Sequence, residues 1–126
     1  QLLLSGDPGS LERLVMILLD NAVKYAGDGG AVNVSLSERQ ERVVLAVRNT
    51  GEPIPQEHLE HLFERFYRVD GSRSRKEGGY GLGLAIADTI VASHRGQIEV
   101  SSSQEGGTVF TVSLPRGRLD GRFLVF

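Results

Sequence analysis

Two pairs of alternating segments constrain the fold of this chain more than any other feature. Residues 31–38 and 42–49 place apolar side chains at alternate positions, and a short polar link joins them. Residues 96–103 and 107–115 repeat this arrangement around the turn sequence Gln-Glu-Gly-Gly. A period of two is typical of strands that bury one face, and short polar links favour antiparallel hairpins. The sequence therefore predicts two hairpins.

Segments with helical periodicity separate the hairpins. Asp7 and Pro8 are typical of a helix start, and glycines at 27, 29 and 30 are expected to end that helix. Residues 59–67 predict a short helix after turn-like residues 50–58, and residues 82–94 predict a second long helix. Residues 68–81 are polar, basic and glycine-rich, so we expect them to be mobile. Helices that alternate with hairpins indicate an α+β fold with a largely antiparallel sheet.

Composition limits the class of protein. A chain of 126 residues with 40% hydrophobic and 24% charged residues suits one globular domain. No cysteine is present, which excludes disulfides and thiolate metal sites and fits the cytosol. The net charge of −2 argues against a general nucleic-acid binder. From charge alone, the basic group Arg65, Arg68, Arg73, Arg75 and Lys76 predicts a solvated loop.

The glycine-rich stretch 78–83 precedes the second long helix. Such a loop lets backbone N–H groups approach an anion at a helix N-terminus. A dinucleotide-binding turn needs G-x-G-x-x-G directly after a strand, whereas this stretch reads G-x-G-x-G after Ser-Arg-Ser-Arg-Lys-Glu. No Gly-Lys-Ser/Thr follows, so it is not a P-loop either. A plain helix-entry loop remains the alternative.

Polar residues also gather near the end of the first helix. Asn21 and Lys24 are three residues apart and share a helix face, with Asp20 and Tyr25 beside them. An amide oxygen suits Mg²⁺, and a lysine can meet phosphate as a point charge. The alternative is that these residues only solvate the outer face of the helix.

Five stretches carry a resemblance to a known family. They occur in the order LLDNAVKYA (18–26), NTGEPIP (49–55), LFERFYRVD (62–70), GGYGLGLAI (78–86) and GGTVFTVSLP (106–115). Together they resemble the N box, first glycine box, F box, second glycine box and third glycine box of the ATP-binding catalytic domain of sensor histidine kinases. The wider superfamily includes the ATPase domains of DNA gyrase, the 90-kDa heat-shock chaperone and MutL.

The resemblance implies a two-layer α/β sandwich in which helices cover one face of a mixed, mostly antiparallel sheet. It implies a catalytic ATP-binding domain over residues 1–115. ATP would lie between the helices and a lid over residues 63–80, with Phe63 and Phe66 packing the start of the lid. The tail 116–126 lies beyond the last box. It could pack on the sheet, pair with a neighbouring chain or be foreign to the fold.

The resemblance also implies roles for individual residues. Asn21 matches the residue that coordinates Mg²⁺ on the ATP phosphates, Lys24 a phosphate-contacting lysine, and Arg68 an arginine that reaches the γ-phosphate. These three are the expected catalytic residues. Thr108 matches a hydroxyl that supports adenine binding. The remaining expected ATP-binding residues are Tyr25, Asn49, Gly51, Ile54, Gly79, Tyr80, Gly81, Leu82, Gly83 and Leu84.

Asn49 departs from the family pattern, which has an aspartate that accepts a hydrogen bond from the adenine amino group. Asparagine keeps an acceptor oxygen, loses the charge and gains an N–H₂ donor. Because charge-assisted hydrogen bonds are stronger, we expect weaker ATP binding than with aspartate. We also expect less discrimination against GTP, and Pro53 is expected to stiffen the turn.

Ile17 bears on the type of reaction. Hydrolysing members of the superfamily carry a glutamate four residues before the metal-binding asparagine, where it activates water. Ile17 holds that position here and accepts no proton. This favours a protein histidine kinase over an ATPase. A degenerate nucleotide-binding regulatory module without catalysis is the alternative.

The resemblance implies partners that this sequence does not contain. The phosphoacceptor histidine would lie on an upstream dimerisation domain, since His58, His61 and His94 are expected to be structural or exposed. A response regulator would be an indirect partner. The full-length protein is expected to be a homodimer anchored in the bacterial inner or plasma membrane, with this domain cytoplasmic and monomeric when isolated.

Overall fold

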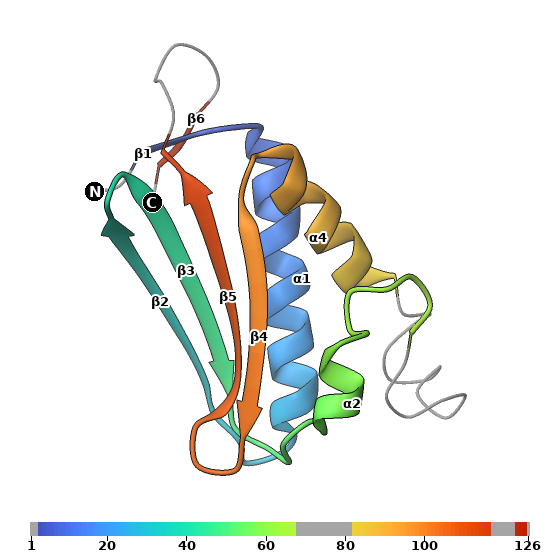
Figure 1. The fold of residues 1–126 in the computed structure, drawn as a ribbon. Coiled ribbons are helices and arrows are strands. Elements are labelled where there is room, and N and C mark those ends of the chain that lie inside the picture. Colours follow the sequence, from blue (N-terminus) through green and yellow to red (C-terminus); the bar gives the residue numbers. More distant parts are fainter. Residues whose placement is uncertain (1–2, 68–81, 117–122, 126) are drawn as a thin grey trace.

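The computed structural model of the chain describes residues 3–67, 82–116 and 123–125. Figure 1 shows the elements in space. Along the chain they are β1 (Leu3–Ser5), α1 (Pro8–Ala26), β2 (Val32–Arg39), β3 (Arg42–Asn49), α2 (Gln56–Leu59), α4 (Gly83–Ser93), β4 (Gln97–Ser103), β5 (Gly107–Pro115) and β6 (Phe123–Val125). The segment 68–81, which we expected to be mobile, lies outside the described residues.

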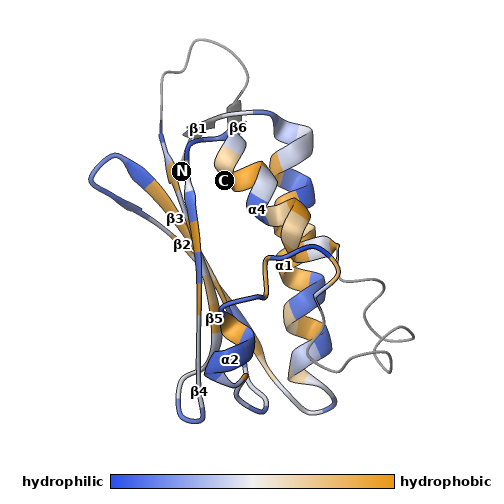
Figure 2. Ribbon diagram, turned by 45° about the vertical axis from the view of Figure 1, so that its right-hand side comes forward, coloured by the Kyte–Doolittle hydropathy of each residue, from blue (hydrophilic) through white to orange (hydrophobic). Residues whose placement is uncertain are grey.

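Four strands form the main sheet in the order β2-β3-β5-β4, and each neighbouring pair is antiparallel. Helices α1 and α4 lie together on one face of this sheet, so Figure 2 shows a layer of helices beside a layer of strands. The predicted two-layer α+β fold and both predicted hairpins are confirmed. No parallel pair occurs among the strands that the structure describes.

The β2–β3 hairpin closes with a two-residue loop. Gln40 and Glu41 both adopt positive φ angles, of 49° and 64°. Positive φ at both central residues matches the right-handed twist of paired strands and is typical of such tight hairpins. The turn fixes the register, in which Arg39 pairs with Arg42 and Val32 with Asn49.

Helix α1 begins and ends where the sequence predicts. The Asp7 carboxylate accepts a hydrogen bond from the Ser10 backbone N–H at 3.1 Å, and Gly27 closes the helix with a φ of 68°. His94, at the end of α4, accepts a hydrogen bond from the Asp7 N–H at its Nε2 (3.1 Å). Its Nδ1 lies 2.8 Å from the Ile90 carbonyl oxygen. His94 therefore joins the end of α4 to the start of α1, which confirms a structural role.

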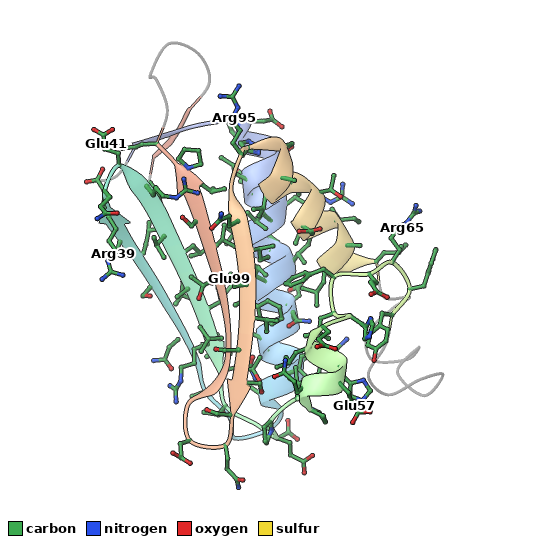
Figure 3. All side chains as sticks on the ribbon, in the orientation of Figure 1. Arg39, Glu41, Glu57, Arg65, Arg95 and Glu99 are labelled. Atoms are coloured by element: carbon green, nitrogen blue, oxygen red, sulfur yellow. The ribbon has the colours of Figure 1, made fainter. Side chains whose placement is uncertain are left out.

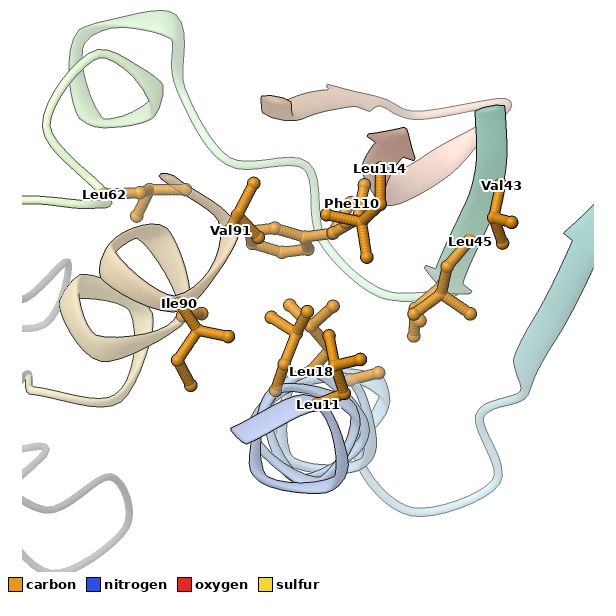
Figure 4. Close-up of a cluster of buried hydrophobic side chains, with 14 of the residues drawn as sticks. Leu11, Leu18, Val43, Leu45, Leu62, Ile90, Val91, Phe110 and Leu114 are labelled. Carbon is orange, nitrogen blue, oxygen red and sulfur yellow. The ribbon is translucent and has the colours of Figure 1, made fainter. Parts of the chain in front are cut away.

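The core lies between the two layers. Helix α1 contributes buried side chains at every third or fourth position, and β3 and β5 contribute alternate residues from the face that meets it. In Figure 4, Leu11 and Leu18 point from α1 toward Leu45, Phe110 and Leu114 of the sheet. The buried apolar residues are Leu11, Leu14, Leu18, Ala22, Val43, Leu45, Val47, Ile54, Leu62, Ala87, Ile90, Val91, Phe110, Val112 and Leu114.

The predicted helix over 59–67 is wrong. The helix α2 covers only Gln56–Leu59, and the chain continues as successive turns. Backbone hydrogen bonds join residues three apart, from the N–H groups of His61, Glu64 and Tyr67. Leu62 enters the core, while Phe66 adopts a φ of 67°, which interrupts a right-handed helix. Tertiary contacts therefore outweigh helical periodicity here.

The C-terminal tail takes part in a strand pairing that the sequence did not predict. Its strand β6 pairs antiparallel with β1, so the two ends of the described chain lie side by side (Figure 1). Arg116, where the tail begins, forms an ion pair with Glu38, and its N–H donates to the Glu41 carbonyl at 3.0 Å. None of the three alternatives that we considered for the tail describes this pairing.

Charged side chains point away from the core. Figure 3 labels Arg39 and Glu41 at the β2–β3 turn, Arg95 beyond α4, and Glu99 on β4. Among the described residues, none of the helices is both long and apolar enough to span a bilayer.

Candidate functional site

A row of polar side chains crosses the sheet near one end. Asn49 on β3 is paired in register with Thr108 on β5, and Thr108 is paired with Ser102 on β4. Asn49 and Thr108 are each only 2% exposed, and they are the buried polar residues of the described chain. Paired residues on neighbouring strands point to the same face. The row therefore lies on the face that the helices cover.

The Asn49 amide is only partly satisfied. Its Nδ2 donates a hydrogen bond to the Thr50 carbonyl oxygen at 2.8 Å. Its Oδ1 is sealed from solvent, and no described residue donates a hydrogen bond to it. An unsatisfied buried acceptor costs about 1–3 kcal/mol, so such an atom calls for an explanation. A ligand that brings an N–H group would supply one.

A chain of hydrogen bonds reaches this row from the turn after β3. The Ile54 backbone N–H donates to Ser102 Oγ at 2.8 Å. Ser102 Oγ in turn lies 2.7 Å from Thr108 Oγ1. Ile54 is buried in the core, so the turn 50–55 is held against the edge strand β4 by both packing and hydrogen bonding.

Two glycines allow close backbone approaches beside Asn49. Gly51 has a φ of 132°, and a Cβ atom there would lie 2.6 Å from the Tyr25 carbonyl oxygen. Gly107 has a φ of 73°, and a Cβ atom there would collide with the Asn49 carbonyl oxygen. Both positions need glycine for conformation and for space. Gly51 thereby brings the turn against the last residues of α1.

The predicted N-box residues lie on the second half of α1, whose Tyr25 carbonyl approaches Gly51 of that turn. Asn21 Oδ1 is buried and, like Asn49 Oδ1, receives no hydrogen bond from a described residue. Lys24 is exposed, and its Nζ lies 5.8 Å from the centroid of the Tyr25 ring. The end of α1 and the turn 50–55 therefore lie against each other at Tyr25 and Gly51.

The start of α4 lies beside the same helix. A Cβ atom at Gly83 would be 3.6 Å from the Ile17 side chain. Leu82 caps α4 without a side-chain hydrogen bond, and Leu84 packs against the core. The first backbone N–H groups of α4 therefore have no capping side chain among the described residues. Four predicted site residues, Arg68, Gly79, Tyr80 and Gly81, lie outside the described residues.

Of the two predicted lid anchors, Phe63 packs against another side chain, whereas Phe66 is exposed to solvent. Phe63 packs edge-on against Phe110, with ring centroids 6.0 Å apart, as expected of an anchor. Phe66 is 62% exposed, so our expectation that it packs the lid start is wrong. Its positive φ turns the side chain outward, where the Arg65 guanidinium lies 5.6 Å from the ring centroid.

The two histidines just before the F box are engaged with their neighbours. His58 Nδ1 lies 2.5 Å from the Tyr67 hydroxyl. His61 is bonded to Glu64 at 2.6 Å, and this hydrogen bond and the carboxylate charge raise the pKa of His61 above its usual 6.5. Within the described part of the chain, no group of three or more His, Cys, Asp or Glu could hold a metal ion. A metal at this site would therefore depend on other ligands.

Comparison with known proteins decides the family. Residues 6–118 match the family described as "Histidine kinase-, DNA gyrase B-, and HSP90-like ATPase". The chain belongs to this family. It is 46% identical over 114 residues to the probable sensor kinase SilS of Salmonella typhimurium, covering 90% of this chain and 23% of that protein. It is 46% identical over 110 residues to the sensor histidine kinase RppB of Synechocystis, covering 87% and 24%. The chain thus spans about a quarter of these relatives.

Solved structures of histidine kinases share the fold. The mycobacterial sensor histidine kinase MprB superposes with a TM-score of 0.79 at 36% identity, over 89% of this chain and 76% of that one. Full-length ShkA in complex with AMPPNP gives 0.75 at 29%, over 87% and 22%. ThkA in complex with the response regulator TrrA gives 0.73 at 26%, over 90% and 30%. Membership in this ATP-binding family confirms the resemblance that the five boxes indicated.

One residue of the site escaped the sequence analysis. Ser102 lies in a run of three serines, and none of them belongs to a box. The signal was nevertheless present, because Ile98, Val100 and Ser102 alternate along one face of β4 and are all partly buried. A serine that continues an apolar alternation into a polar row is a candidate site residue.

Proposed function

We propose that this chain is the catalytic domain of a sensor histidine kinase, which binds Mg-ATP and donates the γ-phosphoryl group to a histidine on a separate dimerisation domain. The observation that carries the proposal is the pair of buried amide oxygens, Asn21 Oδ1 and Asn49 Oδ1, that receive no hydrogen bond from the described residues. They lie on the two elements that meet at Gly51. Asn21 Oδ1 suits a cation, and Asn49 Oδ1 suits an amino group.

The adenine end of the ligand belongs with Asn49 in this proposal. The adenine amino group would donate to Asn49 Oδ1, and the Thr108 hydroxyl would support the same ring. Gly51 holds the turn beside Asn49 against the Tyr25 carbonyl oxygen, and Ile54 would offer an apolar contact for the base. Apolar walls with a few fixed polar groups are typical of small-molecule sites. Tyr25, at the end of α1, adds an aromatic side chain to the same wall.

The phosphate end belongs with α1 and the start of α4. Asn21 would be the protein ligand of Mg²⁺, which usually also takes phosphate oxygens and waters. Bound Mg²⁺ neutralises phosphate charge and aligns the transferred group. Lys24 and Arg68 would add positive charge. The backbone N–H groups at Gly79, Gly81 and Gly83, with Tyr80, Leu82 and Leu84 around them, would line the phosphates at the helix N-terminus.

Phosphoryl transfer, and not hydrolysis, fits the side chain at position 17. Ile17 is partly buried against the start of α4 and offers no base to activate water. In transfer, the bond between the γ-phosphorus and the β,γ-bridging oxygen breaks, a bond to a histidine nitrogen forms, and ADP leaves. The chain's part is to hold and neutralise the phosphates, which supplies most of the catalysis in such reactions.

The partners in this proposal lie elsewhere in a longer protein. Residues 1–115 form the catalytic domain, and the acceptor histidine belongs to an upstream dimerisation domain. The relatives are about four times as long as the matched region, and the solved ThkA complex contains a response regulator. We infer a membrane-anchored homodimer with this domain in the cytoplasm and a response regulator as indirect partner.

Phosphotransfer in trans is the test of the proposed function. The purified chain is mixed with the dimerisation domain of its own full-length protein and with γ-labelled Mg-ATP. We expect the label to appear on the acceptor histidine, in an acid-labile and alkali-stable form. A His→Gln change at the acceptor should remove the label. Nucleotide binding without any transfer to a folded acceptor would favour the regulatory alternative, and steady phosphate release would favour an ATPase.

An Asn49→Asp change tests the assignment of the adenine end. We expect ATP to bind about five- to tenfold more tightly, because a carboxylate accepts the amino group more strongly. The free protein should lose stability, since the new carboxylate is buried and faces the Thr50 carbonyl oxygen. Calorimetry with Mg-ATP and thermal unfolding measure the two effects. Unchanged ATP affinity would remove Asn49 from the adenine contact.

The hydrogen bond of Asn49 bears on the expectation for GTP. Recognition of the guanine O6 would require the amide to present a donor. One of the two Nδ2 hydrogens is donated to the Thr50 carbonyl oxygen, and the second remains a donor. Oδ1, which receives no hydrogen bond from a described residue, suits the adenine amino group, so the expectation of reduced discrimination against GTP stands.

A further inference from the structure

We propose that Thr50 is a positioning residue of the adenine site, which orients the Asn49 amide so that its Oδ1 is left for the adenine amino group. This inference rests on the proposed function, because it concerns how Asn49 meets the base. Thr50 itself contacts neither the base nor the phosphates in this proposal. It acts through its own carbonyl oxygen, to which the Asn49 side chain is hydrogen-bonded.

The hydrogen bond between Asn49 and Thr50 has a fixed direction. A carbonyl oxygen can only accept, so the amide atom that lies 2.8 Å from the Thr50 carbonyl oxygen is the nitrogen, Nδ2. Because the amide group is planar, Oδ1 then lies on its other side. Oδ1 is also the atom that receives no hydrogen bond from a described residue. The Thr50 carbonyl therefore decides which end of the amide is left for a ligand.

The ladder between β2 and β3 departs from its regular form at Thr50. The register pairs Val32 with Asn49, so Ala31 and Thr50 are the next pair beyond the two strands. The Thr50 N–H donates to the Ala31 carbonyl oxygen at 3.0 Å. In a regular hydrogen-bonded pair, the Ala31 N–H would return a bond to the Thr50 carbonyl oxygen. It donates to Thr50 Oγ1 instead, at 2.9 Å.

The Thr50 hydroxyl thus takes the place of the Thr50 carbonyl in the ladder. Threonine side chains can offer a backbone N–H group such an alternative to a ladder bond. Because the Ala31 N–H is satisfied by Oγ1, the Thr50 carbonyl oxygen is available to Asn49 Nδ2. One threonine therefore supplies both of the acceptors that this end of the hairpin needs.

The partner of the Thr50 hydroxyl is held close to the helix layer. Ala31 follows the loop after α1, and a Cβ atom at Gly30 in this loop would collide with the Ala26 carbonyl oxygen. The end of α1, the start of β2 and the end of β3 also lie at the same end of the molecule (Figure 1). Through Ala31 and Thr50, the orientation of the Asn49 amide is tied to the end of α1.

Loss of the Thr50 hydroxyl should return the ladder to its regular form. Valine has nearly the shape of threonine but offers no acceptor, so in Thr50→Val the Ala31 N–H turns to the carbonyl of residue 50. Asn49 Nδ2 must then compete for that carbonyl, and the amide is no longer held in one orientation. The contact with the adenine amino group should weaken, whereas a nucleotide without this amino group has no such contact to lose.

The experiment compares ATP with purine riboside triphosphate, which lacks the amino group of adenine. Dissociation constants of both Mg-nucleotides are measured by calorimetry for the wild type, Thr50→Val and Thr50→Ser. We expect Thr50→Val to weaken ATP binding about fivefold, as for the loss of one net hydrogen bond, and to leave the binding of the second nucleotide nearly unchanged. Thr50→Ser keeps the hydroxyl and should retain the wild-type ratio of the two constants. A merely structural role would weaken both nucleotides alike.

Thr111→Val is the matched control for the change of threonine to valine. Thr111 lies on β5, where it pairs with Ala46 of β3. Its neighbour Phe110 is buried on the face that the helices cover, and side chains alternate along a strand, so Thr111 points to the opposite face. We expect this variant to bind both nucleotides as the wild type does.

The outcomes separate this inference from the proposed function. A wild-type chain that binds no Mg-ATP would overturn the proposed function itself. If the wild type binds ATP but Thr50→Val leaves the ratio of the two constants unchanged, only the role of Thr50 is overturned. Equal binding of the two nucleotides by the wild type would overturn that role as well, because no amino contact would exist to be positioned. If Thr50→Val does not fold, Thr50→Ala is judged by the same criterion.

A double variant tests whether Thr50 acts through Asn49. In a chain that already carries Asn49→Ala, the amide is gone, so Thr50→Val should cause no further loss of ATP affinity. A fivefold loss that persists in the Asn49→Ala chain would show that Thr50 reaches the ligand by another route and would contradict the inference.

Discussion

A Gly107→Ala change is expected to lower the free energy of unfolding by about 3 kcal/mol or more, because it combines backbone strain with a steric collision. Gly107 has a φ of 73°, and its added Cβ atom would collide with the Asn49 carbonyl oxygen. That oxygen belongs to the central strand β3 and to the residue that we assign to adenine. Urea denaturation measures the loss of stability. Calorimetry at a temperature where the variant is folded should show weaker ATP binding as well.

Gly29→Ala is the matched control for this prediction. Gly29 has a similar φ of 77°, but a Cβ atom there would meet nothing within 4 Å. Its replacement should cost only the left-handed strain, about 1 kcal/mol. The difference between the two variants isolates the collision at Asn49. Equal losses would mean that strain alone explains Gly107, and that the close approach to β3 contributes nothing.

The elements that the sequence predicts well are those whose pattern is long. Helix α1 has a capping aspartate, a proline at the first position and a terminal glycine, and each of these acts locally. Strands β3 and β5 bury alternate residues throughout their length. In these elements, local preference and burial agree, so single-sequence reasoning suffices.

Two parts of the fold depend on contacts that the sequence pattern does not encode. The segment after α2 has helical periodicity, yet Leu62 and Phe63 turn toward the core while Phe66 turns out through a positive φ. Strands β1 and β6 have three residues each and come from opposite ends of the chain. Strands this short carry no measurable alternation, and only their pairing defines them.

In the candidate site, too, some features are predictable from the sequence and others depend on the folded structure. The identities of Asn21, Asn49 and Thr108 as site residues came from the five boxes, because an asparagine or a threonine alone predicts no ligand. The placement of Asn49 beside Thr108 is set by the strand register, which pairs the two residues. The register also separates Ser102 from its neighbours Ser101 and Ser103, which point away from the helices. The face on which each serine lies is therefore a property of the folded sheet.

An Asn21→Ala change is expected to reduce phosphotransfer by on the order of a hundredfold, because a metal contact and its charge stabilisation are worth several kcal/mol. The same change should leave stability nearly unaltered. Asn21 Oδ1 is a buried acceptor without a donor among the described residues, so the folded protein loses no bond to that oxygen. Alanine is also the better helix former in the middle of α1.

The opposite behaviour of activity and stability is what makes Asn21 informative. Replacing a residue that merely supports the fold lowers activity in proportion to stability. Replacing a ligand-binding residue whose polar atom has no partner in the free protein lowers activity without lowering stability. Asp20→Ala is the control, because Asp20 is adjacent in sequence but exposed. Phosphotransfer to the acceptor domain, measured over a range of Mg²⁺ concentrations, and thermal unfolding are compared for the wild type and both variants. A large loss of stability in Asn21→Ala, or a loss of transfer that Asp20→Ala reproduces, would contradict the metal assignment. A selective loss of transfer at full stability would instead show that α1 carries an unsatisfied amide in the free protein because the bound nucleotide and its metal complete it.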